Sequence, residues 1–462
     1  MYPAQRIKEL KDEGKLREAW QYGVSELENH PDDPFLKRSL FYLCFEEIKH
    51  IQETILERDN HAPNHTEQNK INGLLTSIVG LNMPIPSDEF RFLLWKFKAN
   101  GEHYKGFVDL ILLHGGNLFR EEDFQPFKAE KGEAPSLLVR CARKVAAACL
   151  SHRSEWSIDV NAVLDFLQYA TESASDTQLL WLKYDHAKCL LVAGRHEDAR
   201  LLALQVLQTK PTESWAWGAL GAAYQKDNHE AAISCFCKGI SCAHEPQFSI
   251  PQRKGLVSLL IKKQNYEIAS AQVKQLIDIY NSHGWRLKSD IEDYIASDWY
   301  DSSVDANASN DYIKQQASNA SQYLVEGAKE HIGIVESHHK SGKGFNVYVS
   351  PDDTFPVRKA LLESKQLPQL GQWLKLSISP EADEIIAVSS AEPSFNEHID
   401  IQTGELRVNH KGFAFVSDTF IAPHLVDKSL DGQDVSVIRV WGFNQKKQEY
   451  TWRGIKVSPN QQ

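Results

Sequence analysis

The spacing of apolar residues changes once along the chain, and this change limits the folds that the chain can adopt. From residue 1 to about residue 300, apolar side chains recur every three or four residues, which is the period of an α-helix. From residue 331 onward they alternate between turn-forming residues, as in β-strands. A polar, acidic, Asn- and Ser-rich stretch separates the two parts. We therefore expect a helical region at 1–300, a linker or connecting helix at 301–330, and β structure beyond it.

The helical part contains a repeat of 34 residues. Trp217, Leu220, Gly221 and Tyr224 fit the W-x2-L-G-x2-Y signature of the tetratricopeptide repeat, and the clearest repeats cover 180–283. A glycine, an alanine and a proline recur at one fixed spacing in two further places: Gly14, Ala19 and Pro31, and Gly194, Ala199 and Pro211. The glycine allows a tight turn between two helices, the small alanine lets the helices approach, and the proline ends the second helix.

Repeats of this type stack into an α-solenoid with a concave groove that holds extended peptides or helices. The resemblance places Trp181, Tyr184, Lys188 and Trp215 at groove positions. Three aromatic rings there would suit an apolar peptide of a protein partner. The alternative is that Trp181 or Trp215 packs between neighbouring repeats.

One hairpin pattern occurs twice in the β part. Residues 343–355 read KGFNVYVSPDDTF, and residues 411–420 read KGFAFVSDTF. Both begin Lys-Gly-Phe, continue as an alternating apolar strand, and reach Thr-Phe after a Ser/Asp turn. The strands and short connections around each copy have the order of a five-stranded OB-type barrel. We therefore expect two small all-β barrels, at 331–390 and 400–460.

The second hairpin resembles a known family. Residues 411–416 resemble the first aromatic strand motif of cold-shock domains, and residues 418–421 resemble the second. The resemblance places Phe413, Phe415 and Phe420 at positions that stack on unpaired bases. The alternative is that these rings form the core of the barrel, because alternation alone does not show which face is inside.

The two copies depart from this family to different extents. In the second copy His424 is displaced by one position because Pro423 precedes it, and the loop between the motifs is short. In the first copy Val347 replaces one aromatic residue, so we expect the second barrel to bind and the first to support it or to assist binding weakly. The predicted nucleic-acid contacts are Lys411, Phe413, Phe415, Phe420, His424, Trp452, Arg453, Phe345 and Phe355.

The negative net charge argues against binding to duplex DNA. The formal net charge is −11, of which residues 331–462, with 14 Lys+Arg and 16 Asp+Glu, contribute −2 and residues 1–330 contribute −9. Binding to duplex DNA depends on many cationic contacts to phosphates. Any nucleic-acid binding must therefore use stacking and a local patch.

Several other functions lack a sequence signal. The seven cysteines show no CxxC pair or disulfide spacing, so we expect no metal, no cofactor and a reduced compartment. Neither a secretory signal nor an apolar run of membrane-spanning length is present, which favours a cytoplasmic protein. Motifs such as G-x-S-x-G and H-E-x-x-H are absent, so we expect no enzyme.

The complete arrangement, tetratricopeptide-like helices followed by two cold-shock-like barrels, resembles a bacterial family encoded near conflict and defence systems. We expect a non-enzymatic adaptor whose helices bind a protein and whose barrels bind single-stranded RNA or DNA. The alternative is a scaffold that binds proteins only, with barrels that are structural.

Overall fold

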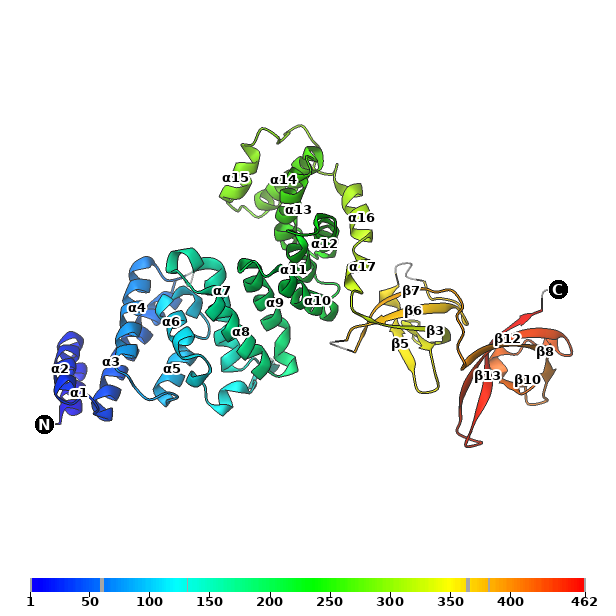
Figure 1. The fold of residues 1–462 in the computed structure, drawn as a ribbon, viewed down its shortest axis with the longest axis horizontal. Helices are drawn as coiled ribbons and strands as arrows, with labels where there is room; N and C mark the ends of the chain where they lie inside the picture. Colours follow the sequence, from blue (N-terminus) through cyan, green and yellow to red (C-terminus); the bar gives the residue numbers. More distant parts are fainter. Residues whose placement is uncertain (1, 59–61, 131, 363–365, 381–382, 461–462) are drawn as a thin grey trace. The chain divides into compact units, whose positions relative to one another are not determined.

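A computed structural model describes residues 2–58, 62–130, 132–362, 366–380 and 383–460. Helices dominate the described residues up to about 324, and strands dominate those after it (Figure 1). The chain forms two compact units: Met1–Val206 with Gly218–Ala232, and Leu207–Trp217 with Ile233–Gln462. The division therefore falls inside the helical region and does not coincide with the predicted linker at 301–330.

The first unit is built from helices and one short hairpin. Neighbouring helices along the chain pack on one another, as α1 does on α2, and α8 does on both α7 and α9. Their apolar faces form a continuous core. The elements are α1 (Pro3–Asp12), α2 (Leu16–Asn29), α3 (Pro34–Leu56), α4 (His65–Gly80), α5 (Asp88–Phe97), α6 (Lys105–His114), β1 (Phe127–Ala129), β2 (Gly132–Ala134), α7 (Leu137–Trp156), α8 (Val160–Ser173), α9 (Asp176–Val192) and most of α10 (His196–Thr209).

The predicted turn glycines and contact alanines have the expected geometry. Gly14 lies between α1 and α2 with a φ of 76°, and Gly194 lies between α9 and α10 with a φ of 77°. Glycine adopts this left-handed region without a steric penalty. Ala19 and Ala199, on the following helices, have no exposed surface. The prediction of tight interhelical turns is confirmed at both places.

The remaining helices follow, and their residues 218–232 belong to the first unit whereas the others belong to the second. These helices are α11 (Ser214–Tyr224), α12 (His229–Cys242), α13 (Ile250–Lys262), α14 (Tyr266–Ser282), α15 (Ser289–Ile295), α16 (Asn310–Ser318) and α17 (Ser321–Leu324). The last two lie in the predicted linker, which therefore carries two short helices. The buried side chain of Gln208, on α10, donates to the carbonyl oxygens of Leu324 and Glu326, both at 3.1 Å, and accepts from Ser379 Oγ at 3.3 Å. This amide connects the helices to the first β module.

The first β module is an antiparallel sheet in the order β5-β4-β3-β6-β7. Its strands are β3 (Lys329–His338), β4 (Gly344–Tyr348), β5 (Thr354–Arg358), β6 (Trp373–Ile378) and β7 (Ile385–Ser390). The side chains of one face form the core: Val335, Phe345, Val347, Val357, Leu374 and Leu376.

The second β module follows the order β8-β12-β13-β11-β10-β9. Its strands are β8 (Ile399–Glu405), β9 (Arg407–Val408), β10 (Ala414–Val416), β11 (Thr419–Ile421), β12 (Asp434–Asn444) and β13 (Glu449–Pro459). Only Leu406 separates β8 from β9, so the two outer strands of this order belong to one stretch of chain and the sheet curls back on itself. β11 and β13 are parallel, whereas the other pairs are antiparallel. This is the strand order of an OB-like module.

The two modules pack against each other within the second unit. Their contact is apolar and combines Ile334 and Tyr348 of the first module with Ile399, Val440 and Ile455 of the second. The Tyr348 hydroxyl also donates a hydrogen bond to the Trp441 carbonyl oxygen. An apolar contact and a hydrogen bond therefore join the first module to the second.

Candidate nucleic-acid interface

Three phenylalanine rings point away from the core of the second module. Along β10, Ala414 and Val416 are completely buried, whereas Phe415 between them is 36% exposed. Successive residues of a strand point to opposite faces, so the barrel core takes the smaller side chains and the ring faces outward. Phe415 pairs across the hairpin with Phe420 of β11, which is half-buried, and half-buried Phe413 lies on the same face of the chain.

These three rings form a cluster that we call the aromatic triangle. The ring centroids of Phe413 lie 5.7 Å from those of both Phe415 and Phe420, and the last two are 5.8 Å apart. The planes of the rings cross at 44° to 89°, so the rings support one another by edge contacts. The remaining exposed surface is apolar and aromatic, which is the surface that an unstacked base can cover.

A tight turn presents a lysine beside the triangle. The Gly412 N–H donates to the Asn409 carbonyl oxygen at 2.8 Å, and Gly412 has a φ of 86°. The Asn409 side chain accepts from the Lys411 backbone N–H at 3.0 Å, while the Lys411 side chain is exposed. The backbone of the turn is thus fixed, and an exposed lysine lies two residues before Phe413.

Phe420, His424 and Arg453 line one cavity, of about 570 Å3, at the junction of the two modules. Phe420 pairs with Arg453 of β13, so the two side chains share a face of the sheet. Arg453 forms an ion pair with Glu336 of the first module, and burial lowers the pKa of the Arg453 guanidinium. The predicted residue Arg453 is therefore already engaged by a carboxylate.

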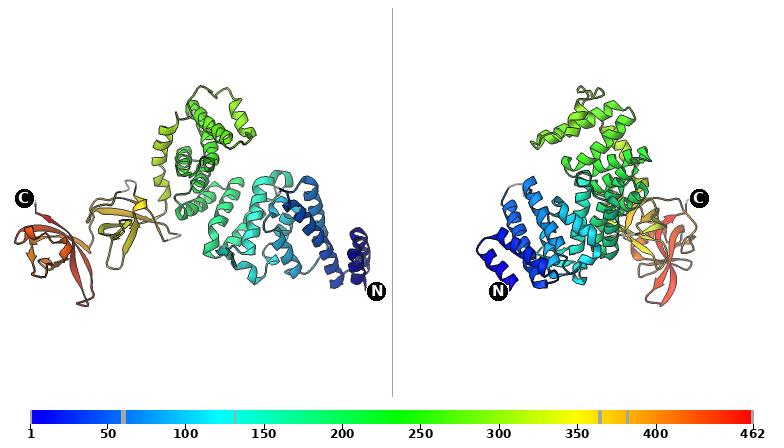
Figure 2. Two further views of the ribbon diagram at one scale, coloured as in Figure 1. Left: turned by 180° about the vertical axis from the view of Figure 1, so that it is seen from behind. Right: turned by 60° about the vertical axis from the view of Figure 1, so that its left-hand side comes forward.

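Trp452 belongs to a second aromatic surface. The ladder between β12 and β8 ends at Val440, and beyond it β12 and β13 continue as a two-stranded ribbon that extends past the sheet (Figures 1 and 2). Four rings occupy alternate positions on one face of this ribbon, which we call the aromatic ribbon: Trp441, Phe443, Tyr450 and Trp452. The cross-strand centroid distances are 5.1 Å for Trp441–Trp452 and 5.3 Å for Phe443–Tyr450.

The base of the aromatic ribbon is fixed by an arginine. The Arg439 guanidinium lies 4.3 Å from the centroid of the Trp452 ring. It also forms ion pairs with Asp400 and Asp418, both at 2.8 Å. One face of Trp452 is therefore covered. Phe443 and Tyr450, nearer the tip, are about half exposed at 50% and 45%.

The prediction that Phe345 contacts nucleic acid is wrong. Phe345 and Val347 have no exposed surface and lie in the core of the first module. They occupy the inward positions that Ala414 and Val416 occupy in the second module. The two copies share the sequence Lys-Gly-Phe, but the inward-facing positions of the strand are shifted by one residue between them. Such a shift moves every side chain to the opposite face of the sheet.

Phe355, the other predicted contact in the first module, follows the same inverted pattern. It pairs with Val347 and packs, half-buried, against the core. Its ring lies 5.1 Å from the His331 ring. Among its described residues, the first module therefore presents no counterpart of the aromatic triangle.

Three of the four predicted peptide-groove residues come together in the first unit. The Trp181 ring, 42% exposed, lies 5.9 Å from the Tyr184 ring, and the Lys188 ammonium lies 5.2 Å above Tyr184. The Arg143 guanidinium lies 5.5 Å above Trp181. Trp215 is half-buried on α11 and belongs to the second unit.

Sequence analysis missed the outer part of the aromatic ribbon. Trp441, Phe443 and Tyr450 alternate on either side of a polar turn, and that alternation was the available signal. His338 and Asn346, which also line the junction cavity, come from the first module and carry no local motif. Their role depends on how the modules pack.

The cysteines, the potential metal ligands and the helices bear on other kinds of site. All seven cysteines are free thiols, and burial raises the pKa of Cys44 to about 12. Among the described residues, no group of three or more His, Cys, Asp and Glu side chains is placed to hold a metal ion. Each described helix is too short or too polar to cross a bilayer.

Comparisons with known families agree with the placement of the candidate nucleic-acid interface on the second module. Residues 401–457, from β8 to β13, match the S1/CSD-like domain 2 of the TOTE conflict systems, where CSD denotes the cold-shock domain. The second module is similar to this S1/CSD-like domain. The match contains the aromatic triangle and the ribbon, and it supports a cold-shock-like module of a conflict system at this end of the chain. Residues 180–320 match a domain of unknown function (DUF7017). No curated protein matches the chain.

Proposed function

We propose that this protein is a non-enzymatic cytoplasmic adaptor in a bacterial defence system. Its second module binds single-stranded nucleic acid, and its helices, as a tetratricopeptide-type solenoid, bind a protein partner. The observation that carries the proposal is the outward direction of Phe413, Phe415 and Phe420 in a module similar to an S1/CSD-like domain. Outward aromatic rings on such a sheet bind nucleic acid by stacking on unpaired bases.

Local charge supports the same proposal. Residues 401–457 contain eight Lys+Arg and six Asp+Glu, a net charge of +2 in a chain of −11. A small positive excess next to apolar rings favours a flexible single strand, whose bases are free to stack, over a duplex, whose recognition depends on many phosphate contacts.

The adaptor role is supported by the helical region. The repeat-signature residues Trp217 and Leu220 are buried, as expected where repeats stack, and the Trp217 Nε1–H donates to the Pro211 carbonyl oxygen at 2.8 Å. Trp181, 42% exposed, lies 5.9 Å from Tyr184, so part of this aromatic pair reaches the surface of the helical region.

A protein-only scaffold is the second candidate. It is favoured by the state of the arginines near the aromatic surfaces, since Arg439 and Arg453 are both paired with carboxylates. Cations that are neutralised in this way contribute little to phosphate binding. In this case the two modules would serve as a structural element or would bind a polypeptide.

Fluorescence anisotropy with labelled single-stranded RNA and DNA tests the proposal. For an oligonucleotide that covers one OB-type face, about 4–16 nucleotides, Phe415→Ala should remove about 1–3 kcal/mol, a loss of roughly 5- to 150-fold in affinity. Phe395→Ala is the matched control because Phe395 is 98% exposed outside the triangle. Absence of binding by the wild type at low salt would refute the proposal. A nuclease-resistant pull-down through the helices alone would favour the scaffold.

A further inference from the structure

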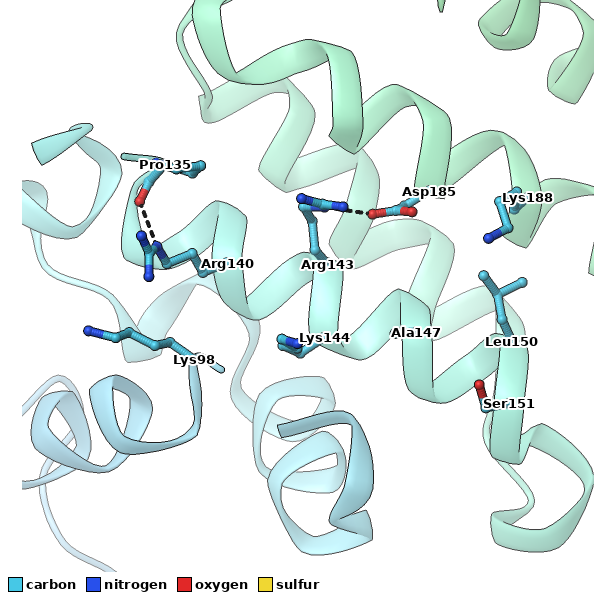
Figure 3. Close-up of a pocket in the computed structure, with 10 residues that line it drawn as sticks. All are labelled: Lys98, Pro135, Arg140, Arg143, Lys144, Ala147, Leu150, Ser151, Asp185 and Lys188. Carbon is cyan, nitrogen blue, oxygen red and sulfur yellow. Dashed lines mark hydrogen bonds and ion pairs between the residues drawn. The ribbon is translucent and has the colours of Figure 1, made fainter. Parts of the chain in front are cut away.

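A second concave site lies in the first unit and is lined by cations. It has a volume of about 480 Å3 and lies between α7, α9 and the end of α5 (Figure 3). Arg140, Arg143 and Lys144 lie within little more than one turn of α7, so their side chains leave the helix close together. Lys188 comes from α9, and Lys98 is the residue at the C-terminal end of α5. We call this site the basic pocket.

The basic pocket has a large excess of positive charge. Arg143 Nε pairs with Asp185 Oδ2 at 2.8 Å, and Lys144 Nζ pairs with Glu102 Oε1 at 2.7 Å. Five cations against these two carboxylates leave three positive charges around one cavity. Such an accumulation is not the consequence of a shortage of acids, because the chain contains 62 Asp and Glu residues.

Aromatic rings hold four of the five cations in place. The distances from cation to ring centroid are 3.9 Å for Lys98 over Trp95, 4.9 Å for Arg140 over Phe127, 5.5 Å for Arg143 over Trp181 and 5.2 Å for Lys188 over Tyr184. A ring face attracts and orients a cation without cancelling its charge, as a carboxylate would. The cations are therefore arranged before any ligand arrives, which reduces the entropy that binding must overcome.

Two of the three lysines of the pocket have no carboxylate partner among the described residues. Within the described part of the chain, neither Lys98 nor Lys188 has a carboxylate oxygen within 4.0 Å. Burial, and after it the charge of Arg140, lowers the pKa of Lys98. Both effects disfavour the protonated amine, and a bound anion would offset them.

The two arginines offer the remaining donors. Arg140 Nε donates to the Pro135 carbonyl oxygen at 3.1 Å, and Arg143 uses Nε for Asp185 (Figure 3). Each guanidinium is thus oriented through Nε, and its two terminal nitrogens can serve a ligand. Such planar forks bind phosphate oxygens with two parallel hydrogen bonds.

We propose that the basic pocket binds a di- or triphosphate group. A triphosphate concentrates several negative charges within a few ångströms, matching cations that converge from three elements on one cavity. An acidic peptide fits less well, because carboxylates on one face of an extended chain lie roughly 7 Å apart. With the aromatic faces already covered by cations, the phosphates rather than a base supply most of the affinity.

Isothermal titration calorimetry of the full chain tests this proposal. The probes are inorganic tripolyphosphate, ATP, adenosine and a hexaglutamate peptide. We expect tripolyphosphate and ATP to bind and adenosine to fail. Equal affinities for the two phosphates would assign the site to the phosphate chain, and tighter binding of ATP would extend it to a nucleotide. Absence of phosphate binding at low salt, or tighter binding of hexaglutamate, would overturn the proposal.

Variants should spare the internal ion pairs. Lys98→Gln combined with Lys188→Gln removes two cations without leaving Asp185 or Glu102 unpaired, and each loss should weaken tripolyphosphate binding roughly tenfold. The control is Lys96→Gln with Lys49→Gln, which removes the same charge from α5 and α3 outside the pocket. An unchanged affinity in the first pair would overturn the proposal.

A wild-type experiment removes any dependence on variant folding. Lysines of the native chain are acetylated with and without tripolyphosphate, and the modified sites are identified by mass spectrometry. Lys98 and Lys188 should be protected by the ligand, whereas Lys96 and Lys49 should react equally in both samples. Equal modification of Lys98 and Lys188 with and without bound ligand would place the ligand elsewhere.

Discussion

The contribution of a phenylalanine ring to the stability of this protein depends on the face of the strand that carries it. Phe345 lies wholly inside the first module, whereas Phe415 is 36% exposed on the second. Phe345→Ala should lower the free energy of unfolding by about 3–5 kcal/mol, since it removes buried surface and leaves a cavity. Phe415→Ala should cost less than about 1 kcal/mol, because a surface position has little packing to lose.

Urea denaturation followed by near-ultraviolet circular dichroism measures both values. Phe395→Ala gives the background effect of losing an exposed ring. If Phe415→Ala destabilises the protein as much as Phe345→Ala, the triangle acts as core and its assignment as a ligand surface is wrong.

A buried histidine makes the helical unit sensitive to acid. His186, on α9, is 5% exposed, and burial, followed by the charge of Arg195, lowers its pKa from 6.5 to about 4. Between these two values the unfolded chain binds the proton and the folded chain does not, so stability falls as pH falls from about 6.5 to 4. The loss approaches about 3 kcal/mol at the lower limit.

The melting temperature as a function of pH tests this prediction. His186→Leu cannot take up a proton and should flatten the decline below pH 6.5. His50→Leu, at an exposed position of α3, is the control and should keep the wild-type slope. An identical slope in His186→Leu and wild type would show that other groups cause the acid sensitivity.

At the scale of elements, the contact between the two modules holds the aromatic ribbon. The Tyr348 hydroxyl donates to the Trp441 carbonyl oxygen, and the Trp441 N–H donates to the His398 carbonyl oxygen at 2.9 Å. Tyr348→Phe removes the first bond and leaves a partly buried acceptor without this donor, at a cost of about 1–3 kcal/mol. We expect faster amide exchange in residues 441–452 by hydrogen–deuterium exchange mass spectrometry. Tyr450→Phe alters an exposed hydroxyl of the same ribbon and should leave exchange unchanged, while an unaltered rate in Tyr348→Phe would mean that the ribbon is stable without the first module.

The same elements show what a sequence can and cannot predict here. The change from helical to alternating spacing and the turn glycines Gly14 and Gly194 are local properties, and they were predicted. The face of Phe345 was not, since a shift of one residue keeps the motif and exchanges the faces. The basic pocket was also missed, because Lys98, Arg140 and Lys188 are far apart in sequence and meet only when α5, α7 and α9 pack.

At the scale of the whole molecule, charge is distributed unevenly. The chain as a whole carries −11, yet residues 401–457 carry +2 and the basic pocket concentrates three uncompensated cations. A long anion such as duplex DNA meets repulsion over most of the surface, whereas a short anion or strand meets only the local excess. The negative net charge therefore disfavours long anionic ligands more than it disfavours short ones.

This distribution predicts a weak salt dependence for binding of a single strand. With Lys411, the exposed lysine beside the triangle, contacting one phosphate, the slope of log K against log salt should be about −0.7, since each contact to a single strand contributes about that amount. Stacking on Phe413, Phe415 and Phe420 is not screened by salt and should persist. Anisotropy titrations across a salt series give the slope, and Lys411→Gln should reduce its magnitude by about 0.7, whereas Phe415→Ala should lower the affinity without changing the slope. A wild-type slope steeper than about −3 would mean that phosphate contacts, and not the aromatic triangle, dominate binding.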